Sequence, residues 1–127
     1  MEYITIDGDD VGRKITACYL SNDEVGLRLI SNELEAATIK VSNLLKSFGF
    51  DVIFCAADGV VASCEGVVDF SDVFAHIQEL APNSISFSAG VGSNLKDAYV
   101  ALLDAKSNGK NKLCNHSKIE KEKCSEL

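Results

Sequence analysis

The stretch "DVIFCAADGVVASCEG", residues 51 to 66, contains two apolar runs on either side of Asp58 and Gly59. An Asp-Gly pair between apolar segments favours a tight hairpin, because both loop positions of a type I′ turn require a positive φ. We therefore predict strands at about residues 51–57 and 60–64, joined by Asp58 and Gly59. The fold class then depends on the elements that precede and follow this hairpin.

Before the hairpin, the segment "YITI", residues 3–6, has the composition of a short strand. Ser21 is followed three residues later by Glu24, which is the pattern of a capping box at the start of a helix. From Leu27 to Phe48, apolar residues recur at steps of three and four, and Gly49 follows. This spacing predicts one long amphipathic helix over residues 22–48.

After the hairpin, apolar residues spaced three and four apart predict a helix over residues 69–80, which Pro82 ends. The segment "SISFSAGVG", residues 84–92, alternates large with small residues and predicts a strand. A last helix is expected over residues 94–108, with Gly109 as its cap. Its expected inner face consists of Leu95, Ala98, Leu102 and Ala105.

The predicted order of elements is β, α, β, β, α, β, α. This order is typical of a ferredoxin-like, or split βαβ, fold of the α+β class with an added C-terminal helix. We expect an antiparallel sheet with its helices on one face. We assign residues 1–113 to this single domain and residues 114–127, which mix charges without an apolar period, to a charged tail.

The composition restricts the class of protein. Apolar residues make up 46% of the 127 positions, and the net charge is −7. Such a chain is expected to be globular and not to bind DNA or RNA directly, since a nucleic-acid binder needs a basic surface. We see neither a membrane span nor a basic leader, so we expect a cytoplasmic protein with no membrane partner. The five cysteines contain no C-x-x-C pair, and we expect reduced, mostly buried thiols.

Negative charge gathers in "YITIDGDDVGRKI", residues 3–15, directly after the first predicted strand. In a ferredoxin-like sheet this strand lies beside the central hairpin, so Asp7 and Asp58 are expected to meet at one edge. Two carboxylates this close repel each other unless a cation lies between them, and hard oxygen ligands favour Mg²⁺ or Mn²⁺. Asp58 also suits a tight turn and Asp7 a strand end, so each residue alone has a structural explanation.

Two further groups suit phosphate. The turn formed by Asp10, Val11 and Gly12 is expected to expose backbone N–H groups after the strand, where a glycine lets a ligand approach. Lys106 and Lys110 stand four apart at the end of the last predicted helix, which returns toward the first strand. The two lysines are expected to hold a triphosphate, although the helix dipole alone would favour lysines at that end.

Three segments together carry a resemblance to a known family. They are "IDGDD", "FCAADGVV" and "FSAGVGSNLKDAYVALLDAKSNGKNKL". Over about residues 3–113 the chain resembles palm-type nucleotide cyclases: the GGDEF diguanylate cyclases and, more closely, the minimal CRISPR polymerase (mCpol) family, which is related to the palm domain of type III CRISPR signalling polymerases.

The resemblance implies roles for individual residues. Asp7, the Gly8 carbonyl and Asp58 would hold the metal, with Asp9 as a further candidate ligand. The turn at residues 10–12 and the lysines Lys106 and Lys110 would bind the nucleotide phosphates. The hairpin departs from the GGDEF pattern at Ala56, Ala57 and Gly59, which leaves fewer carboxylates for two metal ions and gives no support for guanine specificity.

The implied activity is metal-dependent nucleotidyl transfer. The product would be a cyclic di- or oligonucleotide, of the cyclic di-AMP type, made from ATP or another nucleoside triphosphate with release of pyrophosphate. A homodimer would bring two nucleotides together, and a separate effector would read the product in antiviral signalling. The alternatives are a palm-fold GTP cyclohydrolase, a nucleotide-binding domain without turnover, and a purely structural palm module.

Overall fold

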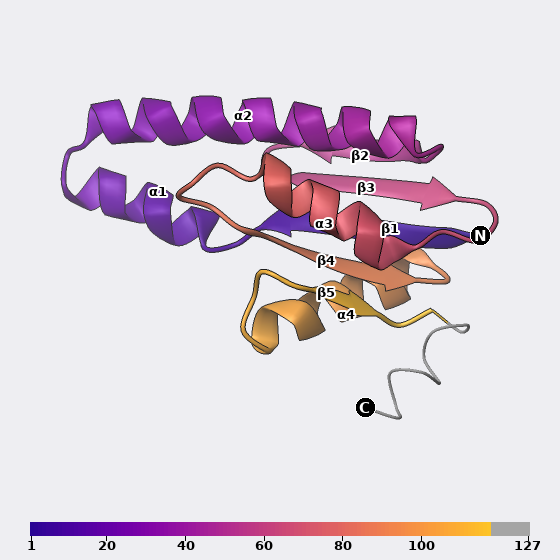
Figure 1. Ribbon diagram of the computed structural model, residues 1–127. Helices are drawn as coiled ribbons and strands as arrows, with labels where there is room; N and C mark the ends of the chain where they lie inside the picture. The colour runs from indigo at the N-terminus through magenta and orange to yellow at the C-terminus, as the bar shows by residue number, and fades with distance from the viewer. Residues whose placement is uncertain (118–127) are drawn as a thin grey trace.

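The computed structural model describes residues 1–117, and a twisted sheet with helices packed on it accounts for most of them (Figure 1). The α+β class predicted from the sequence is confirmed. In chain order the elements are β1 (Glu2–Gly8), α1 (Val11–Leu20), α2 (Glu24–Ser47), β2 (Asp51–Ala56), β3 (Gly59–Cys64), α3 (Phe70–Leu80), β4 (Phe87–Gly92), α4 (Leu95–Ser107) and β5 (Leu113–Asn115).

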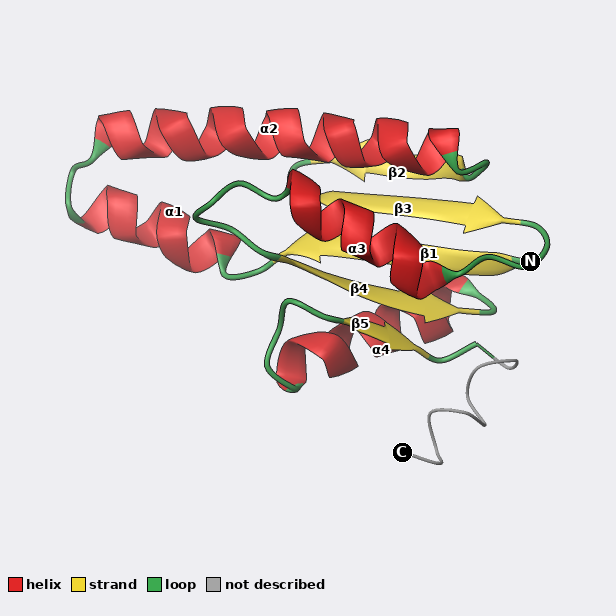
Figure 2. Cartoon of the chain, in the orientation of Figure 1, coloured by secondary structure: helices red, strands yellow, loops and turns green. Residues whose placement is uncertain are grey.

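The strands of the sheet lie in the order β2-β3-β1-β4-β5, so β1 is central (Figure 2). β1 runs antiparallel to both β3 and β4, as expected for a split βαβ fold. β5 runs parallel to β4 at one edge. This strand was not predicted, and it takes Cys114 and Asn115, which the sequence analysis assigned to the tail, into the sheet. From residue 118 onward, the tail lies outside the described residues.

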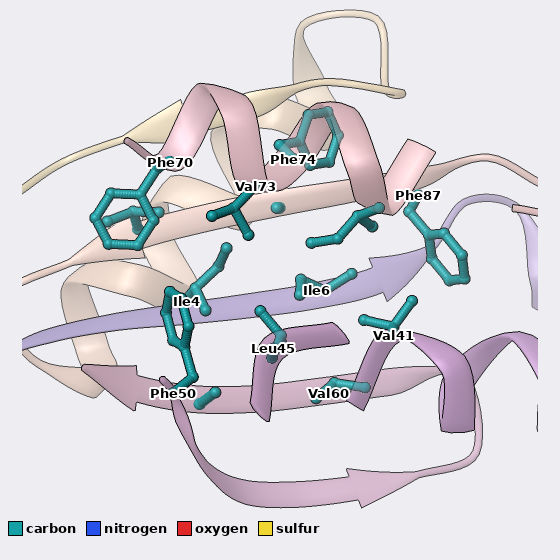
Figure 3. Close-up of a cluster of buried hydrophobic side chains, with 14 of the residues drawn as sticks. Ile4, Ile6, Val41, Leu45, Phe50, Val60, Phe70, Val73, Phe74 and Phe87 are labelled. Carbon is teal, nitrogen blue, oxygen red and sulfur yellow. The ribbon is translucent and has the colours of Figure 1, made fainter. Parts of the chain in front are cut away.

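One face of the sheet packs against α2 and α3 to form the main hydrophobic core (Figure 3). Alternation along β1 points Ile4 and Ile6 into this core, where both are almost fully buried. Val41 and Leu45, four residues apart on α2, belong to the same buried cluster and pack on this face of the sheet. Burying side chains of this size stabilises the fold by roughly 1.5–3 kcal/mol each, so the core holds the end of β1 in a fixed position.

The other face of the sheet carries α4, so the expectation that all helices lie on one face is wrong. A Cβ atom at Gly90 would lie 2.2 Å from the backbone oxygen of Ala98, and one at Gly92 would lie 2.4 Å from the Ala98 nitrogen. The two glycines therefore let the α4 backbone lie directly on β4. Ala98, Leu102 and Ala105 are buried there as predicted, whereas Leu95 is 55% exposed.

The chain between β1 and β2 forms two helices where one was predicted. α1 begins directly after the acidic loop, and Ser21 ends it and does not cap the next helix. α2 is capped by Asp23, whose carboxylate accepts a hydrogen bond from the Gly26 backbone at 2.8 Å. A capping carboxylate satisfies a backbone donor that the helix leaves open. α1 and α2 pack side by side through a small cluster around Val11.

The central hairpin forms as predicted, but its turn lies one residue earlier. Ala57 and Asp58 are the loop residues, and Ala57 has the positive φ, 53°. Gly59 is already in β3, opposite Asp7. A Cβ atom on Gly59 would lie 3.4 Å from an Asp7 carboxylate oxygen, so the glycine leaves room for that side chain.

The expectation of mostly buried thiols holds for only some of the described cysteines. Cys18 and Cys64 are buried thiols, whereas Cys55 is an exposed one on β2. Cys124 lies outside the described residues. No helix within residues 1–117 is both long and apolar enough to cross a membrane.

Candidate active site

The carboxylates of Asp7 and Asp58 lie against each other at the end of β1. The Gly8 backbone N–H donates a hydrogen bond to the Asp58 carbonyl oxygen at 3.1 Å, which fixes the hairpin tip against the strand end. The side chains of Asp7 and Asp58 are close enough to share a hydrogen bond. The structure therefore brings together the two acids that the topology led us to expect at one edge.

The environment of Asp58 disfavours its charged form. Burial raises the pKa of the Asp58 carboxyl, and the neighbouring Asp7 carboxylate raises it further. The Lys106 ammonium acts in the opposite direction but does not reverse the shift. A divalent cation would remove this repulsion and favour the doubly ionised pair, so the acids are suited to binding one.

Lys106 and Lys110 reach the acidic loop from the end of α4, next to the acid pair. The Lys106 ammonium lies 2.8 Å from Asp7 Oδ2, and the Lys110 ammonium pairs with the Asp10 carboxylate. The hydrogen bond from Lys110 lowers the pKa of Asp10. Both lysines therefore lie where a triphosphate at the end of β1 would meet them, and both are neutralised by the loop itself.

The predicted phosphate turn is a helix start. Asp10 has a left-handed backbone with φ 57°, and Val11 and Gly12 are the first residues of α1 and not part of a loop. The Asp10 side chain makes no capping hydrogen bond, so the first N–H groups of α1 have no side-chain cap. Among residues 1–117, no atom apart from those of the adjacent residues and the α1 backbone lies within 4 Å of the place that a Cβ atom of Gly12 would take. Open N–H groups and an uncrowded glycine are what an anion at a helix N-terminus requires.

Asp9 is buried, and its carboxylate is held by donors from other segments. Its side chain is 3% exposed, and it accepts hydrogen bonds from the hydroxyls of Ser86 and Ser88, each at 2.7 Å. The backbone N–H of Asn111 donates to the same carboxylate at 3.0 Å. With both oxygens occupied by donors, Asp9 suits a structural role, and the geometry does not favour it as a metal ligand.

A groove with a volume of about 790 Å³ runs from Asp58 between α1, α2 and the hairpin. The sequence analysis missed it because α1, which forms one wall, was not predicted. The groove is mainly apolar, and its polar groups include Ser31, Glu35 and Thr38 on α2. Pockets of this size and character hold flat organic ligands, with a few polar groups fixing their orientation. The remaining lining residues are Val11, Ile15, Tyr19, Leu27, Ile30, Leu34, Ile39, Cys55, Ala56 and Ala57.

The residues present fit a single divalent ion with substrate completing its coordination. Within residues 1–117, no three acidic, histidine or cysteine side chains converge as a ready-made metal site. Asp7, Asp58 and the Gly8 carbonyl would supply the protein ligands, and water or phosphate oxygens the others. Mg²⁺ is commonly bound in this way, through one or two carboxylates plus substrate phosphates.

The fold is that of the GGDEF domains. The chain is similar to the GGDEF domain of YfiN (also called TpbB) from Pseudomonas aeruginosa, with a TM-score of 0.67 and 18% identity over 90% of this chain and 80% of that one. It is also similar to an EAL/GGDEF domain protein from M. capsulatus, with a TM-score of 0.65 and 21% identity over 90% of this chain and 83% of that one. At these identities the likeness concerns the fold, and it confirms the palm arrangement.

The family model of the minimal CRISPR polymerase domain, mCpol, matches residues 3–116. The chain therefore belongs to the mCpol family, as the sequence motifs led us to expect. Family and fold together support a nucleotidyltransferase or nucleotide cyclase. No curated protein matches the chain.

Proposed function

We propose that this protein joins nucleoside triphosphates, with ATP preferred, into a cyclic di- or oligonucleotide and releases pyrophosphate. The observation that carries the proposal is the Asp7–Asp58 pair, which has a mainly apolar groove on one side and two lysines on the other. The choice of ATP, of the cyclic di-AMP type of product, and of an antiviral signalling role with a separate effector follows the family resemblance.

The groove suits a purine ring. Its apolar walls would stack against the base, and Glu35 and Ser31 offer acceptors for an exocyclic amino group. The groove ends at Asp58, so a nucleotide whose base lies between α1 and α2 would have its phosphates near the start of α1. There the uncapped N–H groups of Val11 and Gly12 would bind phosphate oxygens.

Each phosphodiester linkage of the product forms by making one bond and breaking one bond at phosphorus, so a cyclic dinucleotide requires two such transfers and releases two pyrophosphates. A ribose hydroxyl of one nucleotide attacks the α-phosphorus of another, the bond to the β-phosphate oxygen breaks, and the hydroxyl proton passes to solvent. Mg²⁺ or Mn²⁺ bound at Asp7 and Asp58 would lower the pKa of the hydroxyl and neutralise the transferring phosphate. Lys106 and Lys110 would hold the departing pyrophosphate, so the chain acts mainly by positioning and electrostatics.

Cyclisation requires two nucleotides to face each other, and we propose that a second copy of the chain supplies the second one. On the face of the sheet that carries α4, the helix packs on β4, β1 and β5 and leaves β2 and β3 uncovered within residues 1–117. A row of paired residues crosses this area from Phe54 on β2 to Val61 on β3 and reaches Thr5 on β1 at its border, and Phe54 is 56% exposed. Asp7 lies two residues beyond Thr5 on the same face.

The side of α4 that borders this area is also apolar. Lys106 reaches Asp7 from that side, and Tyr99 and Leu103, seven and three residues earlier, share it. Both are large exposed side chains, at 57% and 45%. A two-fold dimer through this face would bury them and bring two acid pairs toward each other. Leu103→Glu should then give a monomer in sedimentation velocity and abolish product while the fold remains intact; a dimer that persists would contradict this interface.

The activity test is incubation of the protein with each nucleoside triphosphate and Mg²⁺ or Mn²⁺, followed by mass spectrometry and a pyrophosphate assay. We expect a cyclic adenine nucleotide and two-step pyrophosphate release from ATP. Asp7→Asn and Asp58→Asn should each remove detectable product without unfolding the protein. Product in both variants would contradict the proposed site. A formylaminopyrimidine product from GTP would instead indicate a cyclohydrolase, and tight ATP binding without pyrophosphate release a non-catalytic binding domain.

A further inference from the structure

The ammonium group of Lys106 lies among oxygen atoms of three consecutive residues. It donates a hydrogen bond to the Gly8 carbonyl oxygen at 2.9 Å and lies 2.8 Å from Asp7 Oδ2 and 3.6 Å from Asp9 Oδ1. Its side chain is only 24% exposed. Two of these oxygens, on Asp7 and Gly8, are the ones that would coordinate the divalent ion. Lys106 therefore already neutralises the ligands that the metal needs.

The ammonium and a divalent ion cannot both contact these oxygens without strong repulsion. Mg²⁺ binds its oxygen ligands at about 2.1 Å, so the ion and Nζ would be held only a few ångströms apart by the Gly8 carbonyl. Like charges at such a separation repel each other in the partly buried site, and the double charge of the ion doubles the repulsion. Metal binding thus requires the flexible lysine side chain to move away.

Lys106 needs another anion when it moves. The Asp10 carboxylate, which also interacts electrostatically with Lys106, is already paired with Lys110. Asp58 would be taken by the metal. A free metal ion therefore has to displace Lys106 with no new partner for the ammonium, whereas a metal–nucleotide complex brings a triphosphate that can receive it.

We propose that Lys106 is a resident cation that makes divalent-metal binding at Asp7 and Gly8 depend on nucleotide. The ammonium leaves the Asp7 and Gly8 oxygens for the triphosphate when metal and nucleotide arrive together. This inference deepens the proposed function and rests on its metal site. Because the coupling between two ligands is reciprocal, nucleotide should raise metal affinity by the same factor as metal raises nucleotide affinity.

The test measures Mn²⁺ binding by electron paramagnetic resonance and calorimetry, without catalysis. We expect nucleotide-free wild-type protein to bind Mn²⁺ weakly and Lys106→Met to bind it at least about tenfold more tightly, equivalent to about 1.4 kcal/mol. Lys112→Met removes a charge from the same segment, where the ammonium donates to the Asn108 carbonyl oxygen, but leaves Lys106 and the Lys110–Asp10 pair in place, so it should bind Mn²⁺ within about threefold of wild type. Lys106→Arg keeps a cation among the oxygens and should bind as weakly as wild type.

A second measurement adds the non-reacting analogue α,β-methylene-ATP. It should raise Mn²⁺ affinity strongly in the wild-type protein and much less in Lys106→Met, where the metal ligands are already available. Equal Mn²⁺ affinity of nucleotide-free wild type and Lys106→Met would overturn the inference, and so would an equal gain in Lys112→Met. If the exchange is observed but no nucleoside triphosphate gives product, the inference stands and the proposed function fails.

Discussion

Asp7 and Asp9 are separated by a single residue in β1 and its following loop, yet their surroundings differ completely. Asp9 is buried, and two serine hydroxyls and one backbone N–H satisfy its carboxylate. Asp7 is about one-third exposed and lies against a second acid, Asp58. The first arrangement stabilises the fold. The second costs stability unless a cation is present, which is typical of a functional site.

The Asp9 contacts also explain how the segment around Lys110, which we propose binds phosphate, keeps its shape. Lys110 and Asn111 both have positive φ, 63° and 49°, although neither is a glycine. Such conformations cost free energy and persist only when their surroundings hold them. The hydrogen bond from the Asn111 backbone to Asp9 supplies that restraint, so a buried acid in the loop after β1 positions the lysine at the far end of the chain.

The largest difference between the two regions should appear on truncating each acid. We expect Asp9→Ala to reduce the free energy of unfolding by about 3 kcal/mol, because it leaves two serine hydroxyls and the Asn111 N–H without their buried acceptor. Asp7→Ala should change it by less than about 1 kcal/mol, since a partly exposed ion pair contributes little. Guanidinium unfolding of metal-free protein measures both. Similar losses in the two variants would show that the acids do not divide into structural and functional ones.

A smaller effect should separate the two serines that hold Asp9. Ser88→Ala removes a hydrogen bond to a buried charge at a fully buried position, and we expect a loss of about 2 kcal/mol. Ser86→Ala removes an equivalent bond at a half-buried position, where water can replace the hydroxyl, and should cost about half as much. In the Asp9→Ala background the Ser88 substitution should cost clearly less than in wild type. An unchanged cost there would mean that Ser88 acts independently of Asp9.

Periodicity and topology were sufficient for much of this structure. The alternation in residues 84–92, the apolar spacing of α2, α3 and α4 and the central hairpin all reflect faces that pack on the core, so their patterns are visible in sequence. The meeting of Asp7 and Asp58 followed from strand order alone. The roles of the two acids remain a prediction that the activity test decides.

The sequence indicated α1, the position of α4 and the burial of Asp9 only weakly or not at all. α1 was missed because it follows directly on charged residues and contains Gly12, although Val11, Ile15 and Cys18 recur with helical spacing. Gly90 and Gly92 share one face of β4 with Ser88, and this run of small residues is the signal that could have indicated close approach of a helix to the second face of the sheet. The burial of Asp9 could not be inferred, since Asp7, Asp9 and Asp10 look equivalent in sequence and differ only in the partners that distant segments bring to them.

The smallest predicted effect concerns the acid pair itself. Neutralising Asp58 should raise the stability of the metal-free protein, whereas removing the Asp9 carboxylate should lower it. The pKa of Asp58 is raised in the folded protein, by burial first and by Asp7 second. The folded state therefore holds the proton more tightly than the unfolded chain, and metal-free wild type loses stability as the pH rises through that raised pKa. Asp58→Asn imitates the neutral acid and avoids this loss. We expect its unfolding midpoint in chelator to exceed that of wild type at neutral pH.

The difference should shrink as the pH falls toward the ordinary carboxyl pKa of about 4, because wild-type Asp58 is then protonated as well. Added Mg²⁺ should make wild type the more stable protein at neutral pH. The ion stabilises the ionised acid pair of wild type by binding it, whereas Asp58→Asn lacks one of the metal ligands. Thermal unfolding of both proteins across this pH range, with and without Mg²⁺, measures the effect. A variant less stable than wild type in chelator would mean that Asp58 stabilises the hairpin, and the contrast with Asp9 would then disappear.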